Sequence, residues 1–339
     1  MRINKLQFIA ASILISSLFT FFIMDQTKQT TQLQEQKPMY DVGSVKIVPC
    51  KTAPTKFVWK IGISDNAKKT LQREYSVSCF LQKHVSTCEF QSWFSFVRAP
   101  MRKYSNKHCM LLKRRGHNLF HEHWSVTLHK STCPPSKQLI ILNYFALAVR
   151  MIRDVHKAGI VHNDLKPENF CVGQFEREQL HLIDFGMASS TQHEQFKILT
   201  GAGTCDFLPT YMLEQLVESQ RQNKRNYLTS SPIFLDDLES LVYTFVEVMS
   251  GDLPWSNIDQ NAYGKQLLFR QQLKPEELCQ HCSSCMLPIL KKIQQYLQNI
   301  KIFEDRQHHN IFDPKIYEFM LDQITKNKTE LNNGLEKLE

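Results

Sequence analysis

The chain has 339 residues, of which 42% are hydrophobic, and it carries a formal net charge of +8. This length accommodates a domain of about 280 residues with additional segments, and the apolar content supports a large core. The basic residues are scattered and no nucleic-acid-binding motif accompanies them, which excludes nucleic acid from the expected partners.

The N-terminal residues 6–24 contain no charged side chain and are rich in Ile, Leu and Phe. About 19 helical residues are just enough to cross a bilayer. Arg2 and Lys5 precede this stretch and the charge after it is balanced, so the positive-inside rule places residues 1–5 in the cytosol. We expect a signal-anchor in a single-pass membrane protein, with the folded domain in the lumen or outside the cell. A cleaved signal peptide, which would give a secreted protein, is the alternative, and a helix buried in the domain is a third interpretation.

Two polar segments flank the expected domain. Residues 25–37 are rich in Gln, Thr and Lys, which predicts a flexible stalk. We expect the folded domain over residues 38–325 and a frayed polar tail over residues 326–339. The tail contains a sequon at Asn327, which can be glycosylated only outside the cytosol.

The first part of the domain shows a strand followed by a helix. Apolar side chains alternate over residues 57–63, which predicts a strand with Val58 and Lys60 on one face. The pattern of residues 66–83 predicts a helix, in which Glu74 lies fourteen residues after Lys60. An ion pair between these two side chains would hold the lysine ammonium in place.

Further strands and a long helix follow. Residues 88–132 alternate in hydrophobicity, which predicts strands, and residues 109–112 form the strand that leads into a hinge over residues 113–115. Ser136 is a suitable N-cap for an amphipathic helix that ends at Gly159. This helix delivers the chain to its most informative stretch.

That stretch has the pattern H-x-D-x-K-x-x-N, followed after a short predicted hairpin by Asp-Phe-Gly. Asp164 can accept the proton of an incoming hydroxyl, and Lys166 can steady the charge of a transferring phosphoryl group. Asn169 and Asp184 offer hard oxygen ligands for a Mg²⁺ ion that bridges phosphates. Each piece is weak alone, but their order and spacing together indicate phosphoryl transfer.

The remainder of the chain is predicted to be mostly helical. A polar segment at residues 203–209 lies where a substrate would bind. Further helices are predicted over residues 236–249, 261–272, 286–299 and 314–326. We expect Asp237, in the first of these helices, to bond the backbone around Asp164 and so to have a structural role.

These residues resemble the eukaryotic protein kinases, and within them the casein kinase 1 group, particularly its tau-tubulin-kinase-like and nematode-type branches. The markers are the runs Asn-Phe-Cys-Val-Gly at residues 169–173, Gly-Thr at 203–204, Asp-Asp-Leu-Glu-Ser-Leu at 236–241 and Leu-Pro-Trp at 253–255. The resemblance implies an α+β, two-lobed protein kinase fold. It places a small β-rich N-lobe over residues 38–113 and a larger helical C-lobe over residues 114–325.

The resemblance also implies an activity and a set of site residues. It implies an ATP-dependent serine/threonine protein kinase of the non-specific class, which transfers the γ-phosphoryl group of Mg-ATP to a protein substrate. We expect the protein to be monomeric. Asp164 and Lys166 would be catalytic, and Asn169 and Asp184 would hold the metal. The residues implied in ATP binding are Lys60, Glu74, Val45, Val58, Leu112, Arg114 and Cys171.

Three positions depart from the family pattern. Counting back from Lys60, Gly43 is the one glycine that remains of three in the glycine-rich loop, which weakens the expected hold on phosphates. Asn163 replaces an arginine that would answer a phosphate on the activation segment, so such control is not expected. Asp206 stands where the group often has a basic residue, so a preference for acidic substrates should not be carried over.

Two other functions therefore stay open. The thinned glycine-rich loop favours a pseudokinase that acts as a protein-binding scaffold. The expected membrane anchor motivates a lumenal kinase with a non-protein acceptor such as a sugar.

Overall fold

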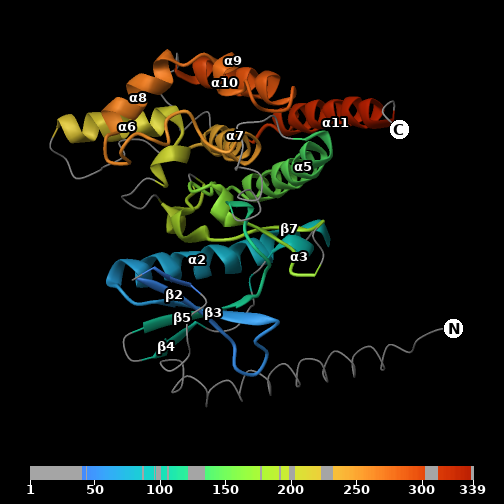
Figure 1. The fold of residues 1–339 in the computed structure, drawn as a ribbon. Helices are drawn as coiled ribbons and strands as arrows, with labels where there is room; N and C mark the ends of the chain where they lie inside the picture. The colour runs from blue at the N-terminus through green and yellow to red at the C-terminus, as the bar shows by residue number, and fades with distance from the viewer. Residues whose placement is uncertain are drawn as a thin grey trace. The chain divides into compact units, whose positions relative to one another are not determined.

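The computed structural model describes residues 40–42, 44–85, 88–94, 96, 101–104, 107–120, 134–175, 178–190, 192–197, 203–222, 232–301 and 312–336. The chain forms two compact units (Figure 1). The first unit comprises Met1–Tyr75 and Phe96–Arg114, and the second comprises Ser76–Ser95 and Arg115–Glu339. The predicted α+β class, with a smaller β-rich part and a larger helical part, is confirmed.

The predicted anchor at residues 6–24 and the stalk at residues 25–37 lie outside the described residues and stay predictions. Of the helices that the structure does describe, none combines the length and the apolar character that a membrane span requires.

The first unit is built on a five-stranded antiparallel sheet in the order β1-β2-β3-β5-β4. Its strands are β1 Tyr40–Val42, β2 Val45–Pro49, β3 Phe57–Gly62, β4 Arg102–Tyr104 and β5 Lys107–Lys113. Trp59 and Ile61 of β3 belong to a buried cluster on one face of the sheet. Because side chains alternate along a strand, Val58 and Lys60 share the other face, as predicted.

Helix α2 (Asp65–His84) follows β3 in the position predicted for a helix. The prediction of strands from residue 88 onward is wrong at its start, where Cys88–Trp93 forms helix α3. The rings of Trp93 and Phe94 lie 4.8 Å and 4.6 Å from that of Phe90, between centroids. These residues are spaced by three and four, so the helical spacing of the aromatic residues outweighs the local alternation.

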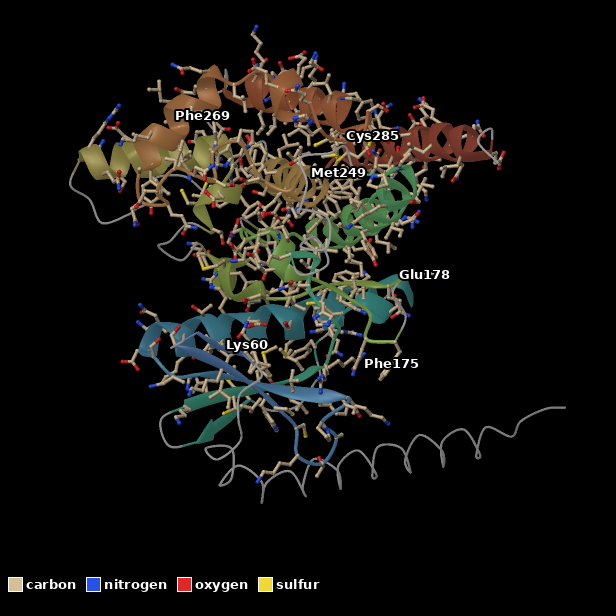
Figure 2. All side chains as sticks on the ribbon, viewed as in Figure 1. Lys60, Phe175, Glu178, Met249, Phe269 and Cys285 are labelled. Atoms are coloured by element: carbon tan, nitrogen blue, oxygen red, sulfur yellow. The ribbon has the colours of Figure 1, made fainter. Side chains whose placement is uncertain are left out.

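The second unit packs long helices around α7, and Figure 1 shows α5, α7, α10 and α11 stacked in it. Helix α5 contacts α7 and α11, and α10 contacts α7. Met249 of α7 and Cys285, just before α10, are buried in this core (Figure 2). The elements of this unit after α3 are α5 Pro135–Lys157, β6 Phe170–Val172, β7 Leu180–Leu182, α6 Thr210–Arg221, α7 Phe234–Ser250, α8 Tyr263–Gln272, α9 Pro275–Leu278, α10 Met286–Lys301 and α11 Pro314–Glu336.

The ends of two helices differ from the sequence prediction. Helix α5 begins at Pro135 with Pro134 as its N-cap, and not at Ser136. A proline suits the first helical turn because its φ is fixed and the N–H it lacks would have no partner within the helix there. The C-terminal end is as predicted, since Gly159 has a left-handed φ of 78°.

Helix α11 continues to Glu336 through the segment in which we expected a frayed tail. Asn327, the residue of the sequon, is 6% exposed, and its Nδ2 donates to Ser284 Oγ at 2.7 Å. A glycan on this nitrogen would displace that bond, so the folded domain does not present Asn327 for glycosylation.

The Glu247 carboxyl on α7 makes stability depend on pH. Burial raises its pKa from 4.5 to about 8, and the carboxylates of Glu168, Asp252 and Asp206 act in the same direction. The unfolded chain releases this proton near pH 4.5 but the folded chain keeps it to about pH 8, so stability falls as the pH rises between these values. We expect the free energy of unfolding of Glu247→Gln to exceed that of the wild type by about 2–4 kcal/mol at pH 9 and by much less at pH 5. Urea unfolding measures this difference.

The matched control is Glu218→Gln, because Glu218 is an exposed carboxylate of α6. It should follow the wild-type pH dependence. If Glu247→Gln also parallels wild type from pH 5 to pH 9, the assigned protonation of Glu247 is wrong.

Candidate active site

The catalytic loop begins where α5 ends. After the left-handed turn at Gly159, the backbone of Val161 forms an antiparallel bridge with Ser189, through two hydrogen bonds of 2.8 Å. His162 lies next in the chain and is fully buried, which lowers the pKa of its ring. Its neutral ring donates from Nε2 to the carbonyl of Ile183 at 3.2 Å and accepts at Nδ1 from the N–H of Asp164 at 3.4 Å. The loop and the strand that precedes Asp184 are therefore held together.

Asp237 of α7 accepts hydrogen bonds from the backbone of the catalytic loop, which confirms its predicted structural role. It is 1% exposed. Its Oδ2 accepts the N–H of His162 at 2.6 Å and Nε2–H of His156 at 2.9 Å, and its Oδ1 accepts the N–H of Asn163 at 2.9 Å. His156 Nδ1 accepts in turn from the Tyr317 hydroxyl at 2.5 Å, and burial raises the pKa of Tyr317 so that the proton stays on its oxygen. This buried carboxylate is satisfied by three donors.

Asn163 takes a left-handed φ of 68°, which asparagine tolerates better than most residues. Its Nδ2 donates to the carbonyl of Met187 at 2.9 Å and to Ser189 Oγ at 2.8 Å. The residue that stands at the family's arginine position therefore binds the segment after Asp184 directly.

The Asp164 carboxylate lies at the centre of the site. Its Oδ2 accepts from Lys166 Nζ at 2.9 Å and from Asn169 Nδ2 at 3.2 Å. Its Oδ1 accepts from both the N–H and the Oγ1–H of Thr204, each at 2.9 Å. Lys166 Nζ also donates to Thr204 Oγ1 at 2.6 Å. The structure thus brings together three predicted site residues and adds Thr204, which the sequence marked as part of the polar segment 203–209 but not as a site residue.

The two predicted metal ligands are joined through the backbone. The N–H of Ile183, next to Asp184, donates to the carbonyl of Asn169 at 2.9 Å. Asn169 Nδ2 is turned toward the carbonyl of Asp164 at 2.7 Å, which directs its amide oxygen elsewhere. Asp184 has a left-handed φ of 66°, and its Oδ1 accepts from the N–H of Gly186 at 3.3 Å.

This donor set fits Mg²⁺. One amide oxygen and one carboxylate are hard ligands, and protein-bound Mg²⁺ commonly uses one or two carboxylates together with water and phosphate oxygens. No group of three or more His, Cys, Asp and Glu side chains gathers as a metal site within the described residues. The remaining ligands would have to come from a nucleotide and from water.

Gly203 brings the segment before Thr204 against the catalytic loop. A Cβ atom built there would lie well under 3.0 Å from the carbonyl oxygen of Asn163 and 3.0 Å from Asp164 Oδ1. We expect Gly203→Ala to push the two segments apart and to lower kcat about 100-fold, because a shift of about 1 Å in a catalytic group has that effect. Steady-state kinetics would measure this. Gly334→Ala is the matched control, because nothing lies within 4 Å of its built Cβ; equal activity of the two variants would refute the argument.

The first unit holds the predicted ion pair. Lys60 of β3, labelled in Figure 2, donates from Nζ to Glu74 Oε2 of α2 at 2.7 Å, and both side chains are largely buried. Lys60 pairs with Ile47 and Met110 across the sheet, so its position is fixed by the strands on both sides. The ion pair predicted from the sequence is therefore present.

Four of the other residues expected to contact ATP belong to the first unit. Val45 lies at the start of β2, and Val58 of β3 pairs with Leu112 of β5. Arg114 donates its N–H to the carbonyl of Lys56 and its Nη1 to that of Pro54, each at 2.8 Å. Its donors thus brace the turn before β3, so a nucleotide contact would have to use its carbonyl oxygen.

Cys171 lies in the second unit, on β6, and burial raises the pKa of its thiol to about 12. Its neutral thiol is suited to an apolar surface. Gly43, on which the prediction of a thinned glycine-rich loop depends, lies outside the described residues.

A family model described as a protein kinase domain matches residues 42–327. The chain belongs to the protein kinase family. As a family, protein kinases use ATP and a divalent cation.

Three relatives are similar over part of their length. The chain is 30% identical over 127 residues to Serine/threonine-protein kinase spe-6 of Caenorhabditis elegans, which is 37% of this chain and 31% of that protein. It is 29% identical over 169 residues to Casein kinase 1-like protein HD16 of Oryza sativa subsp. japonica, 47% of this chain and 22% of that protein. It is 25% identical over 181 residues to Casein kinase I homolog 3 of Saccharomyces cerevisiae, 44% of this chain and 30% of that protein.

The chain therefore spans less than a third of the length of each of these relatives. The names of the rice and yeast relatives agree with the casein kinase 1 resemblance noted in the sequence.

Proposed function

We propose that the chain is an ATP-dependent serine/threonine protein kinase that transfers the γ-phosphoryl group of Mg-ATP to hydroxyl groups of protein substrates. The observation that carries this proposal is the Asp164 carboxylate, which is held by Lys166, Asn169 and Thr204. A carboxylate oriented in this way is suited to receive a hydroxyl proton, and its neighbours are suited to phosphate charge.

In the proposed reaction the substrate hydroxyl oxygen forms a bond to the γ-phosphorus, and the bond from that phosphorus to the oxygen bridging to ADP breaks. The hydroxyl proton passes to Asp164, and the electron pair of the broken bond leaves with ADP. Lys166, 2.9 Å from Asp164 Oδ2, stabilises negative charge on the transferring group. A Mg²⁺ ion held by Asn169 and Asp184 would neutralise charge on the phosphates.

Lys60 supplies a second positive charge for the nucleotide phosphates in this proposal. Its ammonium is held by the Glu74 carboxylate, which fixes the position of the side chain and lowers the entropy lost on binding. The role of Val45, Val58, Leu112, Arg114 and Cys171 in contacting the base or ribose is part of the same proposal.

A pseudokinase is the second candidate, favoured by the single glycine at the position of the glycine-rich loop. Such a protein would keep the fold as a scaffold for other proteins and would bind Mg-ATP weakly or not at all. Against it, the polar side chains that an active kinase needs are all retained in the sequence. Lys60 is paired with Glu74 in the first unit, and Asp164 is bonded to Lys166 and Asn169 in the second.

The two candidates can be separated with the full chain. We expect Mg-ATP to raise the Tm of the wild type, because a ligand that binds only the folded state stabilises it. We also expect label from γ-labelled ATP to reach peptides that carry serine or threonine but not those that carry tyrosine alone. Lys60→Met should lose both the Tm increase and the transfer, whereas Lys51→Met, an exposed lysine of the first unit, should lose neither.

A folded wild type with no Tm increase and no transfer would favour the scaffold. Transfer to tyrosine peptides would contradict the proposed substrate class.

A further inference from the structure

A buried arginine donates hydrogen bonds to the backbone just after Thr204. Arg270 of α8 is 8% exposed. Its Nη1 donates to the carbonyl of Leu208 at 2.5 Å, and its Nη2 donates to the carbonyls of Cys205 and Asp206 at 2.9 Å and 2.8 Å. One guanidinium thus holds three carbonyl groups within four consecutive residues.

The guanidinium of Arg270 contacts two aromatic rings and a glutamine side chain. Its guanidinium carbon lies 4.2 Å from the ring centroid of Trp255 and 5.3 Å from that of Tyr243. Trp255 Nε1 donates to the carbonyl of Asp206 at 2.9 Å. Gln266, one turn earlier on α8, donates to Asp206 Oδ1 at 2.8 Å and accepts from Arg270 Nη2 at 3.2 Å.

The same segment is fastened at its other end to the catalytic loop. Thr204 makes two hydrogen bonds to the Asp164 carboxylate, and residues 205–207 follow at once as a short 3-10 turn. The segment therefore has two anchors, Asp164 at one end and Arg270 at the other. Fixing both ends removes the freedom of the backbone that lies between them.

The choice of residue also argues for a positioning role. Burying a cation is unfavourable, and burial lowers the pKa of Arg270. An apolar side chain would fill a core site without this cost, but it could not bond three carbonyl groups. The fork of Arg270 makes those bonds and stacks on aromatic rings at the same time, which a lysine cannot do.

We infer that Arg270 is a positioning residue for protein substrates: it fixes the backbone of residues 205–208 so that a substrate peptide is held beside Asp164. This inference rests on the proposed kinase function and on the placement of the substrate along residues 203–209. It assigns to α8 an effect on the peptide substrate that is separate from the binding of ATP.

The test compares Arg270→Met and Arg270→Lys with wild type in the full chain. For Arg270→Met we expect the KM for a serine peptide to rise about 10- to 100-fold, with the KM for ATP and the rate of ATP hydrolysis without peptide unchanged. Arg270→Lys should have a peptide KM only slightly lower than that of Arg270→Met, because one ammonium group cannot replace the forked guanidinium. Lys265→Met is the matched control, since it removes an exposed cation from the same helix and should behave as wild type.

A purely structural role gives a different pattern. Loss of folded enzyme lowers kcat but leaves the KM for peptide and for ATP as in wild type, and that result would overturn the inference. Amide hydrogen exchange supplies a readout that does not depend on activity. We expect exchange at residues 205–208 to be about tenfold faster in Arg270→Met, and exchange at residues 161–166 to be unchanged.

Different results would overturn the kinase function and the role of Arg270. A wild type that transfers no phosphate overturns the kinase function and with it the substrate role, while the exchange data still decide whether Arg270 fixes the segment. An active wild type with an unaltered peptide KM in both Arg270 variants overturns only the role of Arg270.

Discussion

Replacement of Asp164 by asparagine is expected to slow phosphoryl transfer by a factor of about 10²–10⁴, which is the contribution of a positioned general base. Asparagine has nearly the same shape, but its side chain has no carboxylate to receive the substrate proton. Its amide also offers one acceptor oxygen, where Asp164 accepts from Thr204 with one oxygen and from Lys166 and Asn169 with the other. The measurement is the initial rate of transfer from γ-labelled ATP to a serine peptide.

Asp164→Asn should still bind the nucleotide, because the bonds that hold Lys60 in the first unit do not involve Asp164. The Tm increase caused by Mg-ATP is therefore the internal check on a folded, loaded variant. Glu194→Gln is the matched control, since it removes an exposed carboxylate from the same unit. Transfer by Asp164→Asn at the wild-type rate would exclude Asp164 as the proton acceptor.

Removal of the Asp237 carboxylate is expected to cost about 3–5 kcal/mol in the free energy of unfolding, because each buried donor left without an acceptor costs about 1–3 kcal/mol. Asp237→Ala leaves the N–H groups of His162 and Asn163 and the Nε2–H of His156 without their acceptor inside the core. Because two of these donors belong to the catalytic loop, activity should be lost as well. Urea unfolding followed by circular dichroism measures the change in stability.

Asp322→Ala supplies the comparison for this variant. Asp322 is an exposed carboxylate on α11 whose partner, Lys326, is also exposed, so its loss should change stability by less than about 1 kcal/mol. If Asp237→Ala unfolds at the same urea concentration as Asp322→Ala, the proposed anchoring of the loop is wrong.

Features that depend on short-range sequence patterns were predictable. The period-two pattern of β3 placed Val58 and Lys60 on one face, and the helix after it placed Glu74 within reach of Lys60. The left-handed end of α5 at Gly159 followed from the preference of glycine for that conformation. Asp237 was expected to bond the backbone of the catalytic loop, and its bonds from the N–H groups of His162 and Asn163 bear this out.

The features that were missed depend on contacts between distant parts of the chain. Thr204 reaches Asp164 across forty residues of sequence, and Arg270 reaches Cys205 across sixty-five. No local pattern distinguishes such a threonine or arginine from an exposed one. Helix α6 was also missed, although a local pattern was available. Met212, Leu213 and Leu216 have helical spacing and are buried, so the sequence could have predicted this helix.

The activity proposed for this chain is the transfer of phosphate from ATP to protein hydroxyl groups. It is tested most directly by the rate at which the purified full chain moves label from γ-labelled Mg-ATP to a serine peptide, with Asp164→Asn purified in parallel. We predict measurable transfer by the wild type and a rate lower by a factor of about 10²–10⁴ in the variant. Indistinguishable rates from two folded preparations would contradict the account, because transfer would then not depend on the carboxylate around which the site is built.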